Sequence, residues 1–262
     1  MTAFRMRWVR LAAALTATWL VPGLAAAQVN AEAIRSQLSK DTQLATLDAS
    51  LVTRAGNTQN TTFGGGILGA IIKRRHLAFA RAQADYATAQ SETTVSRAFA
   101  HVRYNYTLIE ELAVEAYGQL QSDRFRRLAF REVAGFGPRW EIVHKNDIEI
   151  FAATSYMLEN EVLLESEDPP DQRREDFYHR SSNYVGFNYS IDDKSQLTAV
   201  TYIQPRFDRP KDYRVLHESA AVLGITKLLA VKLGITFRYD SEPPVGVRSL
   251  DLEVKNSLQL RF

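Results

Sequence analysis

The sequence predicts an all-β protein, a closed antiparallel transmembrane β-barrel of about twelve strands that follows a cleaved signal peptide. Three observations predict this fold. Apolar and polar residues alternate along most of the chain, the alternating segments are about ten to fourteen residues long, and the last segment ends on a phenylalanine. A tilted membrane-spanning strand needs ~9–11 residues, whereas strands of soluble proteins cluster near ~5–6 residues. Strand length therefore separates a barrel from a soluble sheet with the same alternation.

The composition excludes several other classes of protein. The 262 residues contain no cysteine, which excludes a disulfide framework and a thiolate metal site. Beyond the N-terminus no run of eighteen apolar residues occurs, which argues against a helical membrane protein. Without the first 27 residues, the 32 basic residues fall to 29 against 30 acidic ones, a net charge of −1. Such a balance does not favour nucleic-acid binding, and no cofactor is expected.

Residues 1–27 have the three parts of a signal peptide. Three arginines precede the apolar stretch 11–20, a Pro-Gly pair follows it, and three alanines end it. This pattern predicts export through the Sec pathway, with cleavage between Ala27 and Gln28. The alternative is an uncleaved membrane anchor, but the apolar stretch is short for a span. Residues 28–43 are predicted to form a short periplasmic N-terminal segment.

Residues 44–262 are predicted to form the barrel in the outer membrane of a Gram-negative bacterium. The sheet must close, because each unpaired backbone amide in lipid costs several kcal/mol. An even strand number returns both termini to the periplasmic side. The second, sixth and tenth segments alternate less regularly, so ten strands is the alternative count. The expected strands are 44–54, 60–72, 76–87, 94–106, 111–121, 126–137, 147–158, 181–191, 195–205, 213–224, 228–239 and 250–262.

Two of the predicted connections are long. Residues 138–146 are expected to be a periplasmic connection, and 159–180 a long extracellular loop. This loop holds eight carboxylates against three arginines, a net charge of −5. A run of this kind is typical of a solvated loop. Its carboxylates could instead bind a divalent cation or bridge to lipopolysaccharide through one, but the spacing is not that of a calcium loop and no metal is assigned.

The last strand, 250–262, has one wholly polar face and one face that is apolar except for Asn256. Its terminal aromatic residue resembles the recognition signal of bacterial outer-membrane barrels. Leu258, Leu260 and Phe262 are therefore candidate contacts for the barrel-assembly machinery. The other expected partners are outer-membrane lipid and lipopolysaccharide, and the oligomeric state is left open.

Several segments together resemble one known family. They are 54–58 (RAGNT), 100–106 (AHVRYNY), 122–128 (SDRFRRL), 202–208 (YIQPRFD) with 212–214 (DYR), and 238–246 (RYDSEPPVG). The chain resembles, over about residues 40–262, the YdiY-like salt-induced outer-membrane proteins, family 481 of the domains of unknown function. The resemblance implies an outer-membrane β-barrel and no established activity. A role under salt or osmotic stress is implied by the family's name alone.

Charged residues of both signs lie on the face predicted to line the lumen. One interpretation is a polar pore whose charges select small solutes, and the other is a set of paired charges that fills a narrow interior. The expected function is accordingly an envelope-structural protein or a narrow passive pore. The candidate lumen residues are Arg97, His101, Arg103, Glu115, Arg127, Arg131, Glu149, Lys232, Arg238 and Glu253.

Two alternatives of other classes stay open. A barrel enzyme that hydrolyses lipid or peptide bonds at its rim would need a histidine beside an acid and a nucleophile. His217 has Glu218 next to it, but adjacent strand residues face opposite ways. No catalytic set is predicted, so the protein is not expected to be an enzyme. A soluble periplasmic β-protein is the second alternative, and it predicts that the apolar face of 229–239 packs against protein.

Overall fold

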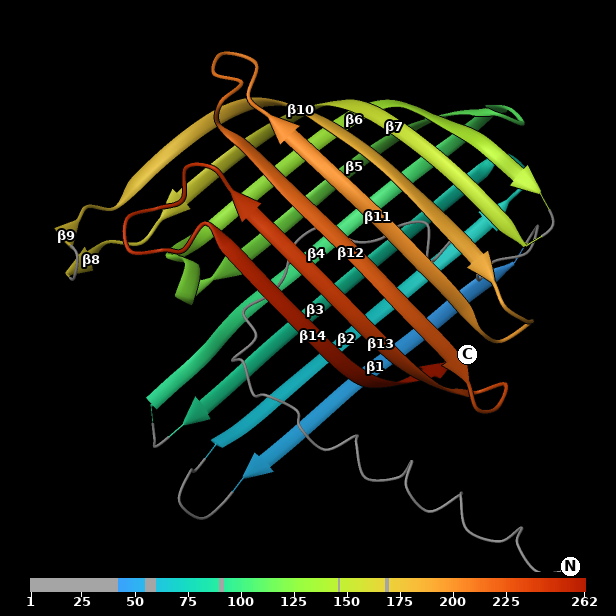
Figure 1. Ribbon diagram of the computed structural model, residues 1–262, viewed down its shortest axis with the longest axis horizontal. Helices are drawn as coiled ribbons and strands as arrows, with labels where there is room; N and C mark the ends of the chain where they lie inside the picture. Colours follow the sequence, from blue (N-terminus) through green and yellow to red (C-terminus); the bar gives the residue numbers. More distant parts are fainter. Residues whose placement is uncertain (1–41, 55–59, 90–91, 146, 168–169) are drawn as a thin grey trace, which may run out of the picture.

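The computed structural model describes residues 42–54, 60–89, 92–145, 147–167 and 170–262 (Figure 1). The predicted signal peptide with its cleavage site at Ala27 and Gln28, and all of the segment 28–43 except its last two residues, lie outside the described residues. Within the described part, no helix is long and apolar enough to cross a bilayer.

The described residues form twelve long strands, one small hairpin and one short helical turn. The strands are β1 (Gln43–Arg54), β2 (Asn60–Lys73), β3 (His76–Ala89), β4 (Glu92–Ile109), β5 (Leu112–Asp123), β6 (Leu128–Lys145), β7 (Ile148–Leu163), β8 (Ser166–Glu167), β9 (Pro170–Asp171), β10 (Arg174–Ser190), β11 (Gln196–Pro205), β12 (Tyr213–Gly224), β13 (Leu229–Asp240) and β14 (Leu250–Arg261), with the 3-10 turn η1 (Arg124–Arg126) between β5 and β6.

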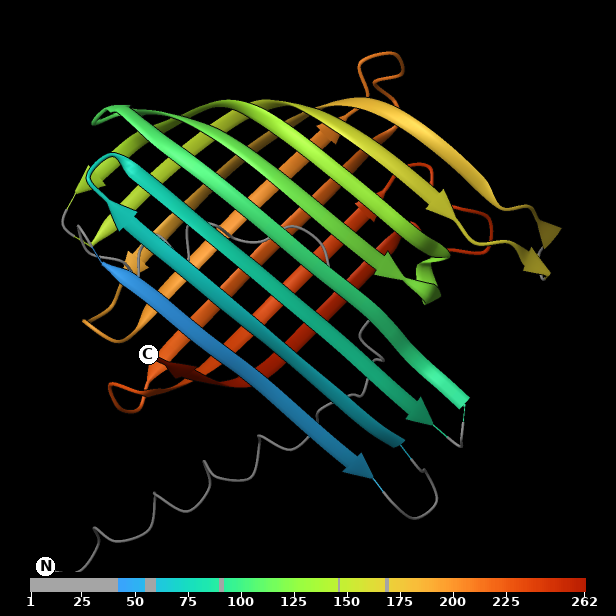
Figure 2. The ribbon, with the colours of Figure 1, turned by 180° about the vertical axis from the view of Figure 1, so that it is seen from behind.

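The twelve long strands close into an antiparallel barrel. Each pairs with its neighbours along the chain, β7 pairs directly with β10, and β14 returns to pair with β1. The predicted fold class is therefore confirmed, and the count is twelve rather than ten. We call the end where β1 begins and β14 ends the terminal rim. The opposite end, which carries η1, the β8–β9 hairpin and residues 206–212 and 241–249, is the loop rim (Figures 1 and 2).

The alternation places polar residues inside and apolar residues outside. On β5, Glu115 and Gln119 are buried in the barrel, whereas Val114 and Leu120 are 43% and 46% exposed on its outer surface. Leu233 on β13 is likewise 43% exposed. A soluble barrel would bury such residues against protein, so the outer surface is the apolar belt of a membrane-spanning barrel.

The predicted periplasmic connection 138–146 is wrong. Residues 138–145 continue β6, which ends at Lys145, and β7 begins at Ile148. A β-bulge lies between Glu141 and Val143, where two residues of β6 lie opposite one residue of β7. The extra residue breaks the period of two, which made the end of a long strand look like a loop.

The predicted loop 159–180 is mostly strand as well. β7 runs to Leu163 and β10 begins at Arg174, and the two strands pair along this whole length. Glu159 and Glu161 continue the inward-facing positions of β7 and are buried. The prediction failed because a strand with several buried carboxylates has the same amino-acid composition as a solvated acidic loop. Only the arginines that pair with these carboxylates from other strands distinguish the strand from the loop.

Candidate functional site

The lumen has a packed side and a polar side. On the packed side, aromatic and aliphatic side chains of β5–β7 and β10–β12 fill the interior. Two clusters meet there, made of Phe151, Ala153, Tyr184, Val200, Tyr202 and Leu216, and of Tyr117, Val133 and Met157. This side of the barrel therefore has a buried apolar core among its described residues, like that of a soluble protein.

Two candidate lumen residues, Arg103 and Glu115, are held within this packing. Arg103 Nη1 lies 3.3 Å from Glu115 Oε2, and the Tyr184 hydroxyl donates to the same oxygen at 2.8 Å. The Arg103 guanidinium also lies 5.1 Å from the Tyr117 ring centroid. His101 stacks between Phe79 and Tyr117 and is almost fully buried. Arg103 and Glu115 thus form structural contacts on the packed side, and His101 connects this side to Phe79 of β3.

An ion-pair cluster closes the packed side towards the loop rim. Its centre is Glu159, which has no exposed surface and contacts three arginines from three strands. Arg180 Nε lies 2.5 Å from Glu159 Oε2, and Arg131 and Arg214 both contact Glu159 Oε1. One carboxylate thus links β6, β7, β10 and β12. We call Arg131, Glu159, Arg180 and Arg214 the rim cluster.

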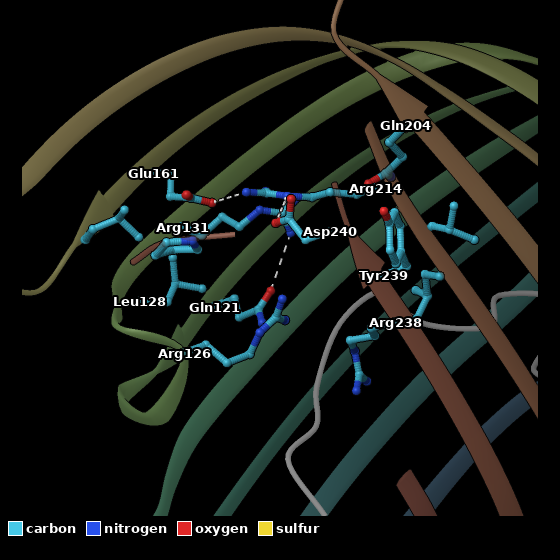
Figure 3. A pocket seen from close by; sticks show the side chains of 14 residues that line it. Gln121, Arg126, Leu128, Arg131, Glu161, Gln204, Arg214, Arg238, Tyr239 and Asp240 are labelled. Carbon is cyan, nitrogen blue, oxygen red and sulfur yellow. Dashed lines mark hydrogen bonds and ion pairs between the residues drawn. The ribbon is translucent and has the colours of Figure 1, made fainter. Parts of the chain in front are cut away.

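Further charges extend the rim cluster to β13 and the loops. Arg214 contacts Glu161 at 2.8 Å and Asp240 at 2.9 Å (Figure 3). Arg180 contacts Asp212, which in turn pairs with Arg206, each at 3.0 Å.

The cavity beside the rim cluster has a volume of about 60 Å³. A water molecule needs roughly 10–15 Å³ of such space, so the cavity holds a few waters and no larger solute.

The polar side of the lumen lies on β1–β3 and β12–β14. Several of its inward charged and polar side chains are half-buried. A third buried apolar cluster, Leu68, Ala70, Phe79 and Phe99, lies on β2–β4 with Leu44 of β1 packed against it. Lys232 lies within electrostatic reach of Arg81, Asp48, Glu218 and Lys255. Small residues occupy neighbouring inward positions, among them Ala220 and Gly234. We call the charged and polar residues of this side, Asp48, Arg81, Gln83, Glu218, Lys232 and Lys255, the polar wall.

A chain of contacts joins the polar wall to two further candidate residues, Arg97 and Glu253. Arg97 binds Asp85 through Nε at 2.9 Å and Glu253 through Nη1 at 3.0 Å. Lys255 Nζ lies 3.0 Å from the second oxygen of Asp85. The candidate Arg238 is buried on β13, within electrostatic reach of Glu218 and Glu253.

Two candidate lumen residues lie at the barrel ends instead of on the mid-height walls. Arg127 sits in the turn before β6 with a φ of 59°, and it binds Asp171 at 2.8 Å and two backbone carbonyls of the loop rim. Glu149 lies at the terminal rim, where Asn188 donates to it at 3.0 Å. The predicted set therefore does not form one site, but divides among the packed side, the polar wall and the two rims.

One group of side chains at the terminal rim has the geometry of a metal site. The ligand atoms of Glu141, His144 and Glu149 all lie within 4.8 Å of one another, because the bulge in β6 turns His144 to the inner face. Each carboxylate also has a protein partner, Arg139 at 3.3 Å for Glu141 and Asn188 for Glu149. Exposed groups of this kind occur without an ion, and no metal is assigned to it.

The sequence analysis missed the residues that make most of the ion pairs. Glu159 and Glu161 were placed in a loop, and Asp85, Arg180, Asp212, Arg214 and Asp240 were not singled out. The available signal was the period of two, which continues through β7 from Ser155 to Leu163 without interruption.

One protein family matches most of the chain. A family model described as "Protein of unknown function, DUF481" matches residues 47–262. No curated protein matches the chain in sequence.

Three solved structures align with most of the chain at low identity and with TM-scores below 0.5. A NanC porin is 12% identical, with a TM-score of 0.46 over 83% of this chain and 97% of its own. A KdgM porin is 8% identical, with a TM-score of 0.41 over 84% and 99%. The translocator domain of autotransporter NalP from Neisseria meningitidis is 10% identical, with a TM-score of 0.44 over 86% and 89%.

Proposed function

The chain belongs to the DUF481 family, which carries no assigned activity, and we propose from its own geometry that it is an outer-membrane barrel with a narrow passive pore. The observation that carries the proposal is the difference between the two sides of the lumen. Charged side chains of the polar wall are half-buried, whereas Arg103, Glu115 and Glu159 on the packed side are almost fully buried. Small polar solutes would pass along the polar wall, and the packed side would act as a rigid support.

The polar wall carries charges of both signs, and this limits how selective the pore can be. Asp48, Glu218, Arg81 and Lys255 all act electrostatically on Lys232. Pores that select strongly for one sign use rings of like charge. We therefore expect a small conductance with weak anion selectivity, since these three cations and two carboxylates sum to one excess positive charge.

The test is single-channel conductance of refolded mature protein, residues 28–262, in a planar bilayer. A heat-modifiable gel shift shows that the barrel has folded. Lys232→Gln is expected to move the reversal potential towards cation selectivity, because it removes one positive charge from the polar wall. Lys227→Gln, at the exposed turn before β13, is the matched control and is expected to leave it unchanged. A folded barrel that never conducts would overturn the pore.

A structural role is the second candidate function, and the filled packed side favours it. A barrel that folds but does not conduct would support this second function, in which the protein stabilises the envelope. We assign no catalytic step to the chain. His217 contacts Thr201 at 2.9 Å on the outer face of β12, while Glu218 faces the lumen.

The remaining parts of the proposal concern the cell envelope. Export through Sec, assembly through the C-terminal strand, contact with lipopolysaccharide and a link to salt or osmotic stress are all proposed. Leu258, Leu260 and Phe262 support assembly through β14, since their side chains are exposed on the outer surface. Deletion of the gene followed by growth in high salt would test the link to stress, and unchanged growth would remove it.

A further inference from the structure

The barrel closes through an unusually short strand pairing. β14 pairs with β1 over four residue pairs, from Thr46 opposite Arg261 to Ala49 opposite Leu258, and Ala45 and Phe262 exchange two further backbone hydrogen bonds. The same β14 pairs with β13 over eleven residue pairs, and β1 pairs with β2 over twelve. Beyond Ala49 the two strands diverge towards the loop rim, as both ribbon views show (Figures 1 and 2). Within the part of the chain that the structure describes, residues 50–54 of β1 and 250–257 of β14 have no pairing with each other, and we call them the unpaired seam.

The unpaired seam lies within the apolar belt. On β14 the outward side chains of Leu252 and Val254 are 56% and 66% exposed, so this part of the barrel faces hydrocarbon. A backbone N–H or C=O group without a partner in hydrocarbon costs several kcal/mol. The seam edges therefore need polar atoms that acyl chains cannot supply.

Ion pairs hold β14 in place where its backbone is not paired with β1. Glu253 and Lys255 reach Arg97 on β4 and Asp85 on β3, at 3.0 Å each. These contacts pass behind β1 and β2, where the inward positions of β2 are the glycines 64 and 66. We call Asp85, Arg97, Glu253 and Lys255 the seam cluster. It places two positive and two negative groups directly inside the unpaired edge.

Asn256 marks the same place on the outer surface. It is the single polar residue on the outward face of β14, and it is the first outward residue beyond the paired segment that ends at Leu258. Its amide offers both donors and an acceptor at the lipid-facing edge of the seam. Polar groups thus flank the unpaired edge on both faces of the barrel.

We propose that the unpaired seam is a lateral portal that admits a membrane lipid of the leaflet at the loop rim. The charged or zwitterionic head group binds the seam cluster and the strand edges, and the acyl chains extend from the bilayer through the gap between β1 and β14 to the inner face beside Ser257. An added β-strand would need two parallel edges at a constant spacing of ~4.8 Å from each, and the diverging edges do not offer them. The portal goes beyond the proposed pore and does not depend on conduction.

Paired cysteines test whether the seam is open, and the chain has no cysteine of its own. If the observed register continued, Leu51 would lie opposite Asn256. In lipid vesicles the double variant Leu51→Cys/Asn256→Cys is expected to form little disulfide. The matched control Ala49→Cys/Leu258→Cys, a pair observed in the register, is expected to form it readily. Equal cross-linking of both pairs would show a closed seam and overturn the proposal.

Tryptophan quenching tests whether lipid enters. After removal of residues 1–27 the chain has one tryptophan, Trp140, which lies on the outer surface of β6. In a Trp140→Phe background, Ser257→Trp places a reporter on the inner face beside the seam, and Ala220→Trp places one on the inner face of β12. The vesicles contain phosphatidylcholine brominated on its acyl chains, which quenches tryptophan on contact.

Ser257→Trp is expected to be quenched to about the extent of Trp140 in the parent protein, and Ala220→Trp far less. If Ser257→Trp were as protected as Ala220→Trp while Trp140 was quenched, no lipid would enter and the proposal would be overturned. The gel shift identifies any variant that does not fold, and the cysteine pair then decides the question. A barrel that does not conduct, but in which Ser257→Trp is quenched, would overturn the proposed pore and support the proposed portal.

Discussion

Glu159 at the centre of the rim cluster is the strongest test of the structure. Glu159→Gln keeps the volume of the side chain and removes its charge, so that Arg131, Arg180 and Arg214 lose their common partner. Removing one partner of a buried ion pair destabilises a protein by about 3–5 kcal/mol, because it leaves an uncompensated buried charge. Arg214 still contacts Glu161 and Asp240 in this variant. The loss of unfolding free energy should therefore lie within this range, and should not be three times as large.

The assay is urea unfolding of the refolded barrel in lipid vesicles, followed by the fluorescence of Trp140. The matched control is Glu242→Gln, which removes the same charge from the exposed pair between Glu242 and Arg209 at the loop rim. Exposed ion pairs contribute about 0–1 kcal/mol, so the control should unfold nearly as the parent does. Equal stabilities of the two variants would show that Glu159 is not buried among three arginines, and would refute the account of the rim cluster.

Three further perturbations follow from the structure. Leu233→Arg places a charge on the outer face of β13 and should lower the free energy of unfolding in vesicles by about 2–4 kcal/mol. Ile225→Arg, at the terminal-rim turn, should change this free energy little. Similar urea midpoints for the two variants would place β13 outside the bilayer. Gly137→Ala should lower the yield of folded barrel in the gel shift, because an added Cβ would overlap the backbone of β7, while Gly69→Ala has open space and should fold normally. At the loop rim the hydrogen bond from an arginine lowers the pKa of Asp171, so its contribution is present above the unfolded value of ~3.9 and is lost as the pH falls through the lower folded value. Proteolysis of the 164–173 connection should therefore rise at acid pH in the parent, and Asp171→Asn should show the faster cleavage already at pH 7.

The period of two was sufficient to predict the fold. It depends on local geometry, because successive side chains of a strand point to opposite faces whatever the strand pairs with. The alternation of 250–262 and 229–239 therefore predicted which face meets lipid, and strand lengths and an even count predicted a closed barrel. The same local rule placed Arg97, His101, Arg103 and Glu115 on the inner face of their strands, where the structure has them.

Tertiary structure decided which inward residues meet. Lys255 meets Asp85 and Arg97 meets Glu253 because β14 lies across the lumen from β3 and β4. No spacing in the sequence encodes such a contact, since it depends on the tilt of the strands and on the register at closure. For the same reason Glu159 looked like part of a loop, although three arginines from other strands neutralise it.

The sequence by itself determined that this chain is a barrel with a polar interior and an apolar outer surface, because polar and apolar residues alternate along each strand. Only the tertiary structure decided that the lumen has a packed and a polar side, and that β1 and β14 pair over four residues. Those features arise from the closure of the sheet, which brings the first and last strands together across some two hundred residues of chain. A register between two strands is a property of the pair, and neither strand carries it alone.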